Sequence, residues 1–338
     1  MSEQASPAEW RVMGETVPGA SHLRAGIPNQ DAILQVRESG RSLPLVLSVS
    51  DGHGSHKCFR SDRGSRFAVK KATQLVGEFL DERRGHGDLA ELERRAKDFL
   101  PREFVKRWRE TAEADLKARP FTPQELDALE QRDSARARKL VETNPLLAYG
   151  ATSLTVAVEE SFVLYLQLGD GEILTGSDAG RVERALPEDE RLFANETTSL
   201  CTNDAEKNFR FRLQTLDGAT RPALILLSTD GYANSFSDSA GFLKVGSDLL
   251  EMLRADGFDQ INASIRGWLE EATRAGSGDD CTLAVVCRMD ALTKRDASAA
   301  APAETVAPVA PVETQAAPAE PPPAPSAEAA QAATPDAQ

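Results

Sequence analysis

The 338-residue chain has few of the residues from which several common kinds of site are built. It contains four cysteines and four histidines, and no two cysteines have the CxxC spacing. This scarcity excludes a cysteine-rich zinc module and a disulfide scaffold, and it is typical of a reducing compartment. Apolar runs reach only about five residues, far fewer than a membrane span requires. Since no basic segment followed by an apolar run opens the chain, we expect no signal peptide and a cytoplasmic location.

Positive charge is also in deficit. The chain has 53 acidic and 39 basic residues, and its formal net charge is -14. Non-specific binding to nucleic acid depends on clustered lysine and arginine, so we expect no nucleic-acid partner and no membrane partner. Hydrophobic residues make up 41% of the chain, which is enough for a folded core.

Familiar catalytic and nucleotide-binding motifs are missing. The sequence has no GxSxG nucleophile elbow and no GxxxxGK[ST] phosphate loop. Gly169 and Gly171 begin a GxG pattern, but Leu174 stands where the dinucleotide fingerprint needs glycine. His53 and His56 are three residues apart with no third ligand nearby in the sequence, so zinc is not expected.

The composition changes sharply at about residue 290. Residues 291–338 contain no aromatic residue, hold 9 of the 19 prolines and consist mostly of Ala, Pro and Glu. Such a segment cannot bury enough apolar surface to offset the entropy lost on ordering. We therefore expect a globular domain over 1–290 and a disordered tail over 291–338, which is either inert or a tether to a partner.

Strand-like and helix-like stretches alternate through the globular part. Short β-prone runs predict strands at 31–37, 44–50, 153–158, 162–168, 223–228 and 282–288. Apolar spacing predicts helices at 63–82, 247–255 and 258–274, and a charged helical insertion at 88–143 that is broken near Pro120 and Pro123. The segment 171–210 is weakly patterned and is expected to be a loop-rich insertion.

The helical insertion is longer and more charged than a simple connection requires. One interpretation is a set of solvated helices that covers one sheet. The other is a docking surface with Trp108 and Phe121 as apolar anchors. The sequence leaves both open.

Aspartates stand at the ends of several predicted strands. Asp51, Asp170 and Asp230 each follow an apolar run and precede a glycine, Asp31 opens a strand, and the pair Asp279-Asp280 directly precedes one. Asp-Gly is a common turn dipeptide, so each instance alone carries little weight. Their recurrence favours carboxylates that converge on one edge of a sheet structure.

Converging carboxylates repel one another unless a cation neutralises them. Hard divalent ions such as Mg2+ and Mn2+ prefer oxygen ligands. A glycine lets the backbone come close, so the carbonyl oxygen of Gly52 can serve as a further ligand. The pattern therefore predicts a site for Mg2+ or Mn2+.

Taken together, the motifs resemble those of a known family. They are Asn29-Gln30-Asp31-Ala32, Asp51-Gly52-His53-Gly54, Gly150-Ala151-Thr152-Ser153, Gly169-Asp170-Gly171, Ser228-Thr229-Asp230-Gly231 and Gly278-Asp279-Asp280. In order and approximate spacing, over about residues 14–290, the chain is similar to the metal-dependent protein serine/threonine phosphatases of type 2C, especially a bacterial branch. The resemblance implies an α+β fold, a four-layer α-β-β-α sandwich of two mostly antiparallel sheets flanked by helices, with two or possibly three Mn2+ or Mg2+ ions at one end.

The same resemblance implies a role for each aspartate. Asp51 would bridge two ions through its carboxylate, and Gly52 would offer its carbonyl oxygen to one of them. Asp230 and Asp279 would complete the ligands of the other ion. Asp170 would join Asp230 in holding a third, weaker ion, and Asp31 matches a position that acts through water or a neighbouring ligand.

Two positions depart from the family pattern. Gln30 stands where a glutamate is common, and its uncharged amide is expected to weaken the binding of the second metal. The phosphate-binding arginine of familiar members falls on Gly26 here. Arg24 is the nearest replacement and His22 is the alternative, while the simpler interpretation of Arg24 is a solvent-exposed side chain.

The resemblance implies hydrolysis without a phospho-enzyme. Paired divalent ions lower the pKa of a shared water, which attacks phosphorus directly. His53, two residues after Asp51, is the candidate general acid for the leaving serine or threonine oxygen. The alternative is that His53 orients Asp51 or caps the following helix.

The sequence thus predicts a protein serine/threonine phosphatase that depends on Mn2+ or Mg2+ and acts in signalling. Its partners would be phosphoserine and phosphothreonine proteins, together with a cognate serine/threonine kinase. Two alternatives stay open. One is a non-catalytic phosphoprotein-binding regulatory module on the same fold, and the other is a phosphohydrolase of small molecules.

Overall fold

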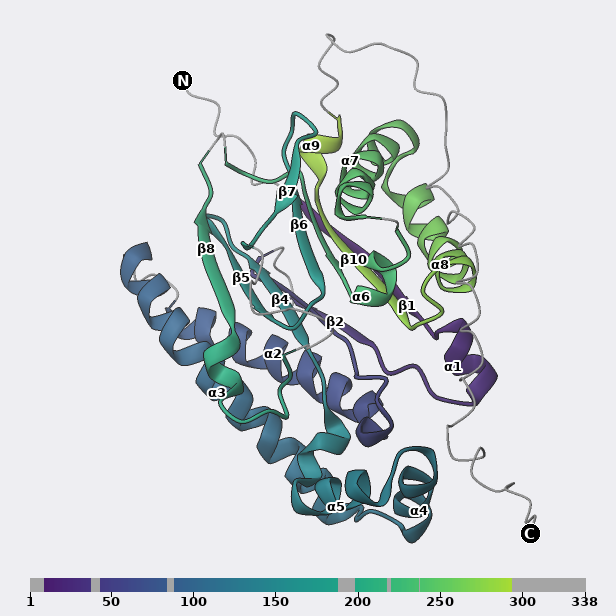
Figure 1. The fold of residues 1–338 in the computed structure, drawn as a ribbon. Helices are drawn as coiled ribbons and strands as arrows, with labels where there is room; N and C mark the ends of the chain where they lie inside the picture. Colours follow the sequence, from purple (N-terminus) through teal and green to yellow (C-terminus); the bar gives the residue numbers. More distant parts are fainter. Residues whose placement is uncertain are drawn as a thin grey trace, which may run out of the picture.

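The computed structural model describes residues 9–37, 43–83, 88–187, 198–217, 220–236 and 238–293. They form two five-stranded antiparallel sheets that pack face to face, with helices on both outer faces (Figure 1). The first sheet has the order β1 (Trp10–Val17), β10 (Cys281–Arg288), β9 (Leu224–Ser228), β6 (Glu172–Gly176), β7 (Val182–Arg184). The second has the order β2 (Ala32–Arg37), β3 (Leu45–Ser50), β4 (Ser153–Val158), β5 (Phe162–Leu168), β8 (Arg210–Thr215). The predicted four-layer sandwich is confirmed.

Long helices make the two outer layers. The second sheet is covered by α2 (Ser61–Arg83) and α3 (Leu89–Ala118), and the first by α7 (Ser239–Asp256) and α8 (Phe258–Ala275). Shorter elements are α1 (Ala20–Ala25), α4 (Pro123–Arg132), α5 (Ala135–Thr143), α6 (Asp230–Ala233), α9 (Met289–Thr293) and the 3-10 turns η1 (His56–Cys58), η2 (Pro145–Tyr149) and η3 (Ala205–Asn208). None of the helices in the described ranges has both the length and the apolarity that crossing a membrane demands.

The central strands are buried along their whole length, as is seen for β3, β4, β5, β9 and β10. One face of each packs on the other sheet, where Leu47, Val156, Ile225 and Val286 belong to the shared core. The other face lies under helices. Because both faces are covered, these strands carry nearly continuous apolar runs, and this is why the sequence predicts them.

Four strands escaped prediction: β1, β6, β7 and β8. Three of them, β1, β7 and β8, lie at sheet edges, where exposed positions interrupt the apolar pattern. The prediction that 171–210 is a loop-rich insertion is wrong for β6 and β7, which complete the first sheet. Both strands are short, at 5 and 3 residues, and this explains their weak signal.

Trp108 on α3 lies inside the molecule. Its side chain is 0% exposed, and its indole N–H donates to the carbonyl oxygen of Gly64 in α2 at 2.9 Å. Phe121 is partly buried against Phe59, with ring centroids 5.2 Å apart. The interpretation of Trp108 as a docking anchor is therefore wrong, and α3 forms part of the layer that covers the second sheet.

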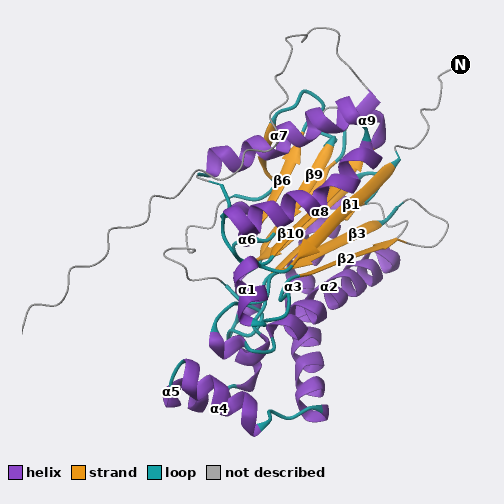
Figure 2. Cartoon of the chain, turned by 90° about the vertical axis from the view of Figure 1, so that its right-hand side faces the viewer, coloured by secondary structure: helices purple, strands orange, loops and turns teal. Residues whose placement is uncertain are grey.

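Helices α4 and α5 end the predicted helical insertion and lie at the same end of the molecule as α1 (Figure 2). The expected break near Pro120 and Pro123 is present, because Pro123 opens α4 at its first position. A capping box fixes this start, since Thr122 and Glu125 each accept a hydrogen bond from the other's backbone N–H. The insertion is thus a set of three helices whose ends are specified locally.

The last described element extends past the predicted boundary at residue 290. Helix α9 runs to Thr293, and Ala291 and Leu292 in it are buried. Residues 294–338, which make up most of the predicted disordered tail, lie outside the described residues. The division into a domain and a tail stays a prediction.

Replacing Trp108 with alanine is expected to lower the free energy of unfolding by about 3–5 kcal/mol, because a large buried side chain is lost. Urea unfolding followed by circular dichroism measures this change. Leu140→Ala on α5 is the control, since Leu140 is 46% exposed and its loss is expected to cost less than about 1 kcal/mol. Equal effects of the two substitutions would contradict a structural role for Trp108.

Candidate metal centre

The predicted aspartates meet because of the direction of the strands that carry them. In an antiparallel sheet alternate strands run in the same direction, so β3 and β5 end at the same end of the sheet. Asp51 and Asp170 lie just beyond these strand ends. In the facing sheet, β9 ends where β10 begins, and Ser228 pairs with Leu283 there. Asp230 follows β9 and Asp279 precedes β10, so both sheets contribute carboxylates to the same end of the sandwich.

Asp51, Asp170 and Asp230 form a compact carboxylate cluster. One side-chain oxygen from each lies within 4.8 Å of those of the other two. Burial raises the pKa of Asp51 well above its ordinary value, and the charges of Asp31, Asp230 and Asp170 raise it further. Burial also raises the pKa of Asp230, with further contributions from Asp170 and Asp279. The protein therefore holds negative charges together against their mutual repulsion.

Asp279 lies beside this cluster and belongs to a second group with His22 and Asp280, whose potential ligand atoms also lie within 4.8 Å of one another. The Asp279 side chain is 51% exposed, and His22 Nε2 is 3.5 Å from its Oδ1. Gly231, which follows Asp230, lies against this segment, and a Cβ at this glycine would lie 2.0 Å from the carbonyl oxygen of Asp280. Only glycine allows this close approach.

Asp31 lies beneath the cluster and connects the two sheets. Its Oδ2 accepts hydrogen bonds from the hydroxyls of Thr229 (2.8 Å) and Thr282 (2.7 Å). Asp31 precedes β2 in one sheet, whereas the two threonines belong to the β9 and β10 side of the other. Burial raises its pKa to about 8, although the two hydroxyls oppose the shift. Through these two hydrogen bonds, Asp31 joins the two sheets next to the carboxylate cluster.

Asp280 is a site residue to which the sequence assigned no role. Its Oδ1 accepts from the backbone N–H of Gly19 and its Oδ2 from that of Gln30, both at 2.6 Å, and His22 Nδ1 is 3.0 Å from Oδ1. Asp280 therefore ties the segment around α1 to the edge of the first sheet. Its position directly after Asp279 was the one available signal.

Gly52 occupies a position with no room for a side chain. A Cβ there would lie 2.6 Å from the carbonyl oxygen of Gln30 and 2.9 Å from that of Ser61. Gly52 also forms a β-bridge with Ala151. The side chain of Gln30 is buried, and its Oε1 has no hydrogen-bond partner among the described residues.

The Gly150-Ala151-Thr152 motif, which directly precedes β4, supports the backbone of Asp51. Thr152 accepts from the backbone N–H of Asp51 through Oγ1 at 3.0 Å, and its own N–H donates to the carbonyl oxygen of Asp51 at 2.8 Å. The hydroxyl of Ser50 donates to the carbonyl oxygen of Thr152 at 2.6 Å. These contacts fix the backbone from which the Asp51 carboxylate projects.

His53 packs against Gly150 next to the cluster. The backbone N–H of His53 donates to the carbonyl oxygen of Gly150 at 3.3 Å. A Cβ at position 150 would lie 2.7 Å from the imidazole Cδ2 of His53. Burial lowers the pKa of His53, and the charge of Asp170 opposes this effect. The imidazole is therefore placed among the same groups as the carboxylates.

Arg24 and His22 lie on opposite sides of α1. His22 is buried and reaches Asp279 and Asp280, whereas Arg24 is exposed. Within the described part of the chain, no ion pair or hydrogen bond joins Arg24 to the carboxylates. The structure thus brings His22 to the centre and leaves Arg24 at the surface.

The residues present fit divalent metal ions. The largest contributions to the pKa of Asp51 come from burial and from other carboxylates, with no lysine or arginine among them. Carboxylate and carbonyl oxygens are the ligands that Mg2+ and Mn2+ prefer. Asp51, Gly52, Asp170, Asp230 and Asp279 supply such oxygens at one end of the sandwich.

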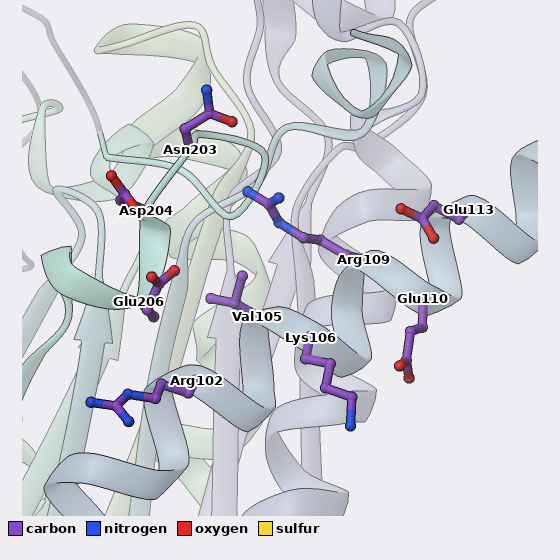
Figure 3. A pocket seen from close by; sticks show the side chains of 9 residues that line it. All are labelled: Arg102, Val105, Lys106, Arg109, Glu110, Glu113, Asn203, Asp204 and Glu206. Carbon is purple, nitrogen blue, oxygen red and sulfur yellow. The ribbon is translucent and has the colours of Figure 1, made fainter.

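One cavity of the described structure lies away from these residues. It measures about 570 Å3 and is lined by residues of α3, among them Arg102, Lys106 and Arg109, and by Asn203, Asp204 and Glu206 around η3. In Figure 3, Arg109 points toward the segment around η3 and Lys106 points away from it. None of the predicted site residues lines it. Its walls carry charges of both signs, unlike the carboxylate cluster.

The sandwich thus gathers carboxylates from both sheets at one end, an arrangement that fits divalent metal ions. Residues 18–270 match the family model described as Protein phosphatase 2C. Since this match spans more than half of the chain, the chain belongs to the protein phosphatase 2C family. Membership confirms the predicted function, a phosphoprotein phosphatase for serine and threonine, and the predicted dependence on Mn2+ or Mg2+.

Several solved structures have a similar fold. Serine/threonine phosphatase Stp1 from Staphylococcus aureus is 15% identical, with 85% of this chain and 99% of that chain covered and a TM-score of 0.49. PppA from Pseudomonas aeruginosa is 19% identical, with 82% and 97% covered and a TM-score of 0.44. The catalytic domain of the phosphatase PstP, in complex with two manganese ions, is 17% identical, with 83% and 98% covered and a TM-score of 0.46. No curated protein sequence matches the chain.

Manganese is expected to raise the melting temperature of the purified protein by about 5 °C or more at 100 times its dissociation constant, because it binds only the folded centre. Asp51→Asn is expected to melt higher than the wild type in EDTA, because one of the repelling charges is gone, and to lose the response to manganese. Differential scanning fluorimetry measures both effects.

Asp98→Asn is the matched control for this experiment, since Asp98 is an exposed carboxylate on α3 outside the cluster. It should melt like the wild type with and without manganese. A metal response that Asp51→Asn retains in full would show that the ion binds elsewhere.

Proposed function

We propose that this phosphatase removes phosphate from phosphoserine and phosphothreonine proteins at the Asp51–Asp170–Asp230 cluster, by direct attack of water on phosphorus. The observation that carries the proposal is the approach of these three carboxylates to within 4.8 Å at the edge of both sheets. A binding module would have no need to bury charges that repel one another. An enzyme that positions divalent ions does need them.

Each residue of the centre has a proposed task. Asp51 and Gly52 would hold the ions from the second sheet, and Asp230 and Asp279 would hold them from the first. Asp170 contributes a further carboxylate next to Asp230, and Asp31 acts from below without direct contact. When bound, the ions activate the attacking water and neutralise charge on the phosphoryl group.

Direct attack is supported by the chemistry of the cysteines. Cys58 and Cys281 are buried, and burial raises the pKa of each thiol to about 12. Burial likewise raises the pKa of Cys201, which lies near Cys58. A protonated, buried thiol is a poor nucleophile, so these side chains do not offer a route through a covalent enzyme intermediate.

His53 is proposed as the general acid. Its imidazole packs against Gly150, and the charge of Asp170 in the cluster acts on its pKa. For the phosphate itself, Arg24 is the proposed contact, since its exposed guanidinium on α1 is accessible to a phosphoprotein. His22 is already engaged with Asp279 and Asp280.

The proposed location is the cytoplasm. There the phosphatase would act in signalling and reverse the phosphorylation carried out by a cognate serine/threonine kinase. All four cysteines are free thiols in the structure, which suits a reducing compartment. The partners would be the phosphorylated targets of that kinase.

Purified protein is expected to hydrolyse p-nitrophenyl phosphate and a phosphothreonine peptide with manganese, and to lose both activities in EDTA. Asp51→Asn and Asp230→Asn are each expected to lower kcat by about 1000-fold or more, because the charge that holds the ions is reduced. Asp98→Asn should keep wild-type rates. Catalysis that survives EDTA would contradict the proposal, and peptide binding without hydrolysis would favour the regulatory module.

His53→Gln separates the two interpretations of this histidine. A general acid helps most when the leaving group is a poor one, as the threonine alkoxide is compared with p-nitrophenolate. We therefore expect kcat for the phosphothreonine peptide to fall about 100-fold and kcat for p-nitrophenyl phosphate to change much less. Equal losses on both substrates would instead show that His53 orients Asp51.

A further inference from the structure

A second cavity of about 250 Å3 adjoins the metal centre. Three parts of the chain line it: the end of α1 with Gly26–Pro28, the segment Gly54–His56 that follows His53, and one face of α4. Gln30, which precedes Asp31, also lines it. Because Gly54 and Gln30 are chain neighbours of the centre, the cavity lies where a polypeptide near the phosphate would pass.

Gln30 lines this cavity with a buried side chain. Its side chain is only 6% exposed, and its Oε1 has no hydrogen-bond partner in the described chain. Its backbone is fixed, since its N–H donates to Asp280 at 2.6 Å. Gln30 is therefore a fixed part of the cavity wall.

The other walls of the cavity are mostly apolar. They include Ile27, Pro28, Phe59 and Leu129. Such a lining favours an apolar side chain, and the volume is large enough for leucine, methionine or an aromatic residue.

The opening of the cavity is positively charged. Arg132 is exposed there and takes part in no ion pair with another described residue. The one carboxylate that lines the cavity, Glu125, is already paired with Arg60. The remaining charge at the opening therefore favours an acidic partner.

Helix α4 is held firmly in place as one wall. Arg60, which is 4% exposed, donates from Nε to Glu125 Oε1 at 2.8 Å and from Nη2 to Oε2 at 2.9 Å. Such bidentate pairs between guanidinium and carboxylate fix geometry as well as charge. Arg60 is nine residues after Asp51, so α4 is clamped to the same segment that carries the metal ligands. The cavity exists before any substrate arrives.

We propose that this cavity binds a large apolar side chain of the phosphoprotein substrate, a few residues from the phosphorylated serine or threonine. An acidic substrate residue faces Arg132 at the opening. The proposal rests on the proposed function, since the same substrate must place its phosphate at the carboxylate cluster. Substrates would then share a bulky apolar residue and an acidic neighbour near the phosphorylated site.

The test begins with phosphothreonine peptides in which a single phenylalanine is moved from position -4 to +4 in an alanine background. Wild-type enzyme with manganese is expected to show kcat/KM about tenfold higher or more for one position or two adjacent positions. Equal kcat/KM at all positions would overturn the proposal.

Two variants fill the cavity from different elements: Ala128→Phe on α4 and Ala25→Phe on α1. Each is expected to abolish the preference for phenylalanine, whereas Gln131→Phe, which adds the same side chain at an exposed position of α4 outside the cavity, is expected to keep it. Melting temperatures check that all three variants fold. A preference that persists in both filled variants would contradict the proposed site.

The charged opening is tested with Arg132→Glu. With glutamate or lysine placed beside the preferred phenylalanine, the wild type is expected to favour glutamate about two- to fivefold, and Arg132→Glu is expected to reverse this preference. Arg136→Glu on α5, an exposed arginine that does not line the cavity, is the control. An unchanged preference in Arg132→Glu would remove the acidic residue from the proposal.

The two proposals fail in different ways. p-Nitrophenyl phosphate has no side chain to occupy the cavity, so its hydrolysis reports on the metal centre alone. If the wild type does not hydrolyse it with manganese, the proposed function fails. If it does, but peptide preferences are absent or unaffected by filling the cavity, only the binding site for the apolar side chain is wrong.

Discussion

Repulsion between partly buried carboxylates is the constraint on which this structure depends. Asp51, Asp170 and Asp230 come from both sheets, and burial together with their mutual charge raises the pKa of Asp51 and of Asp230. Nothing in such an arrangement favours folding by itself. The sandwich around it compensates, since its central strands are buried on both faces and its core is continuous between the sheets. The stability of the scaffold is what allows the centre to be unfavourable without its ions.

Support for the centre comes from neutral groups. Hydroxyls of Thr229 and Thr282 donate to Asp31, and Thr152 bonds both the backbone N–H and the carbonyl oxygen of Asp51. Backbone N–H groups of Gly19 and Gln30 hold Asp280. Neutral donors orient the carboxylates while leaving their charge for the metal, whereas lysine or arginine in these positions would compete with it.

Much of this arrangement could be predicted from the sequence. Strands such as β3 and β9 have apolar runs because they are covered on both faces, and each runs directly into an aspartate. What could not be predicted depends on contacts between distant segments. Asp280 gains its role only when α1 packs beside β10, and Trp108 shows its buried position only when α3 packs on α2. The edge strands β1 and β8 gave weak signals, since part of each is exposed.

The pair formed by Arg60 and Glu125 has a consequence for how such enzymes diversify. The ten-residue helix α4 is held by this pair, by the capping box that shares Glu125 and by the buried side chain of Leu129. The outward positions of the helix are therefore free to vary in evolution while the hydrolytic residues stay unchanged. Gene duplicates could acquire separate targets through a handful of codons in this one helix, and the ancestral chemistry would be inherited intact.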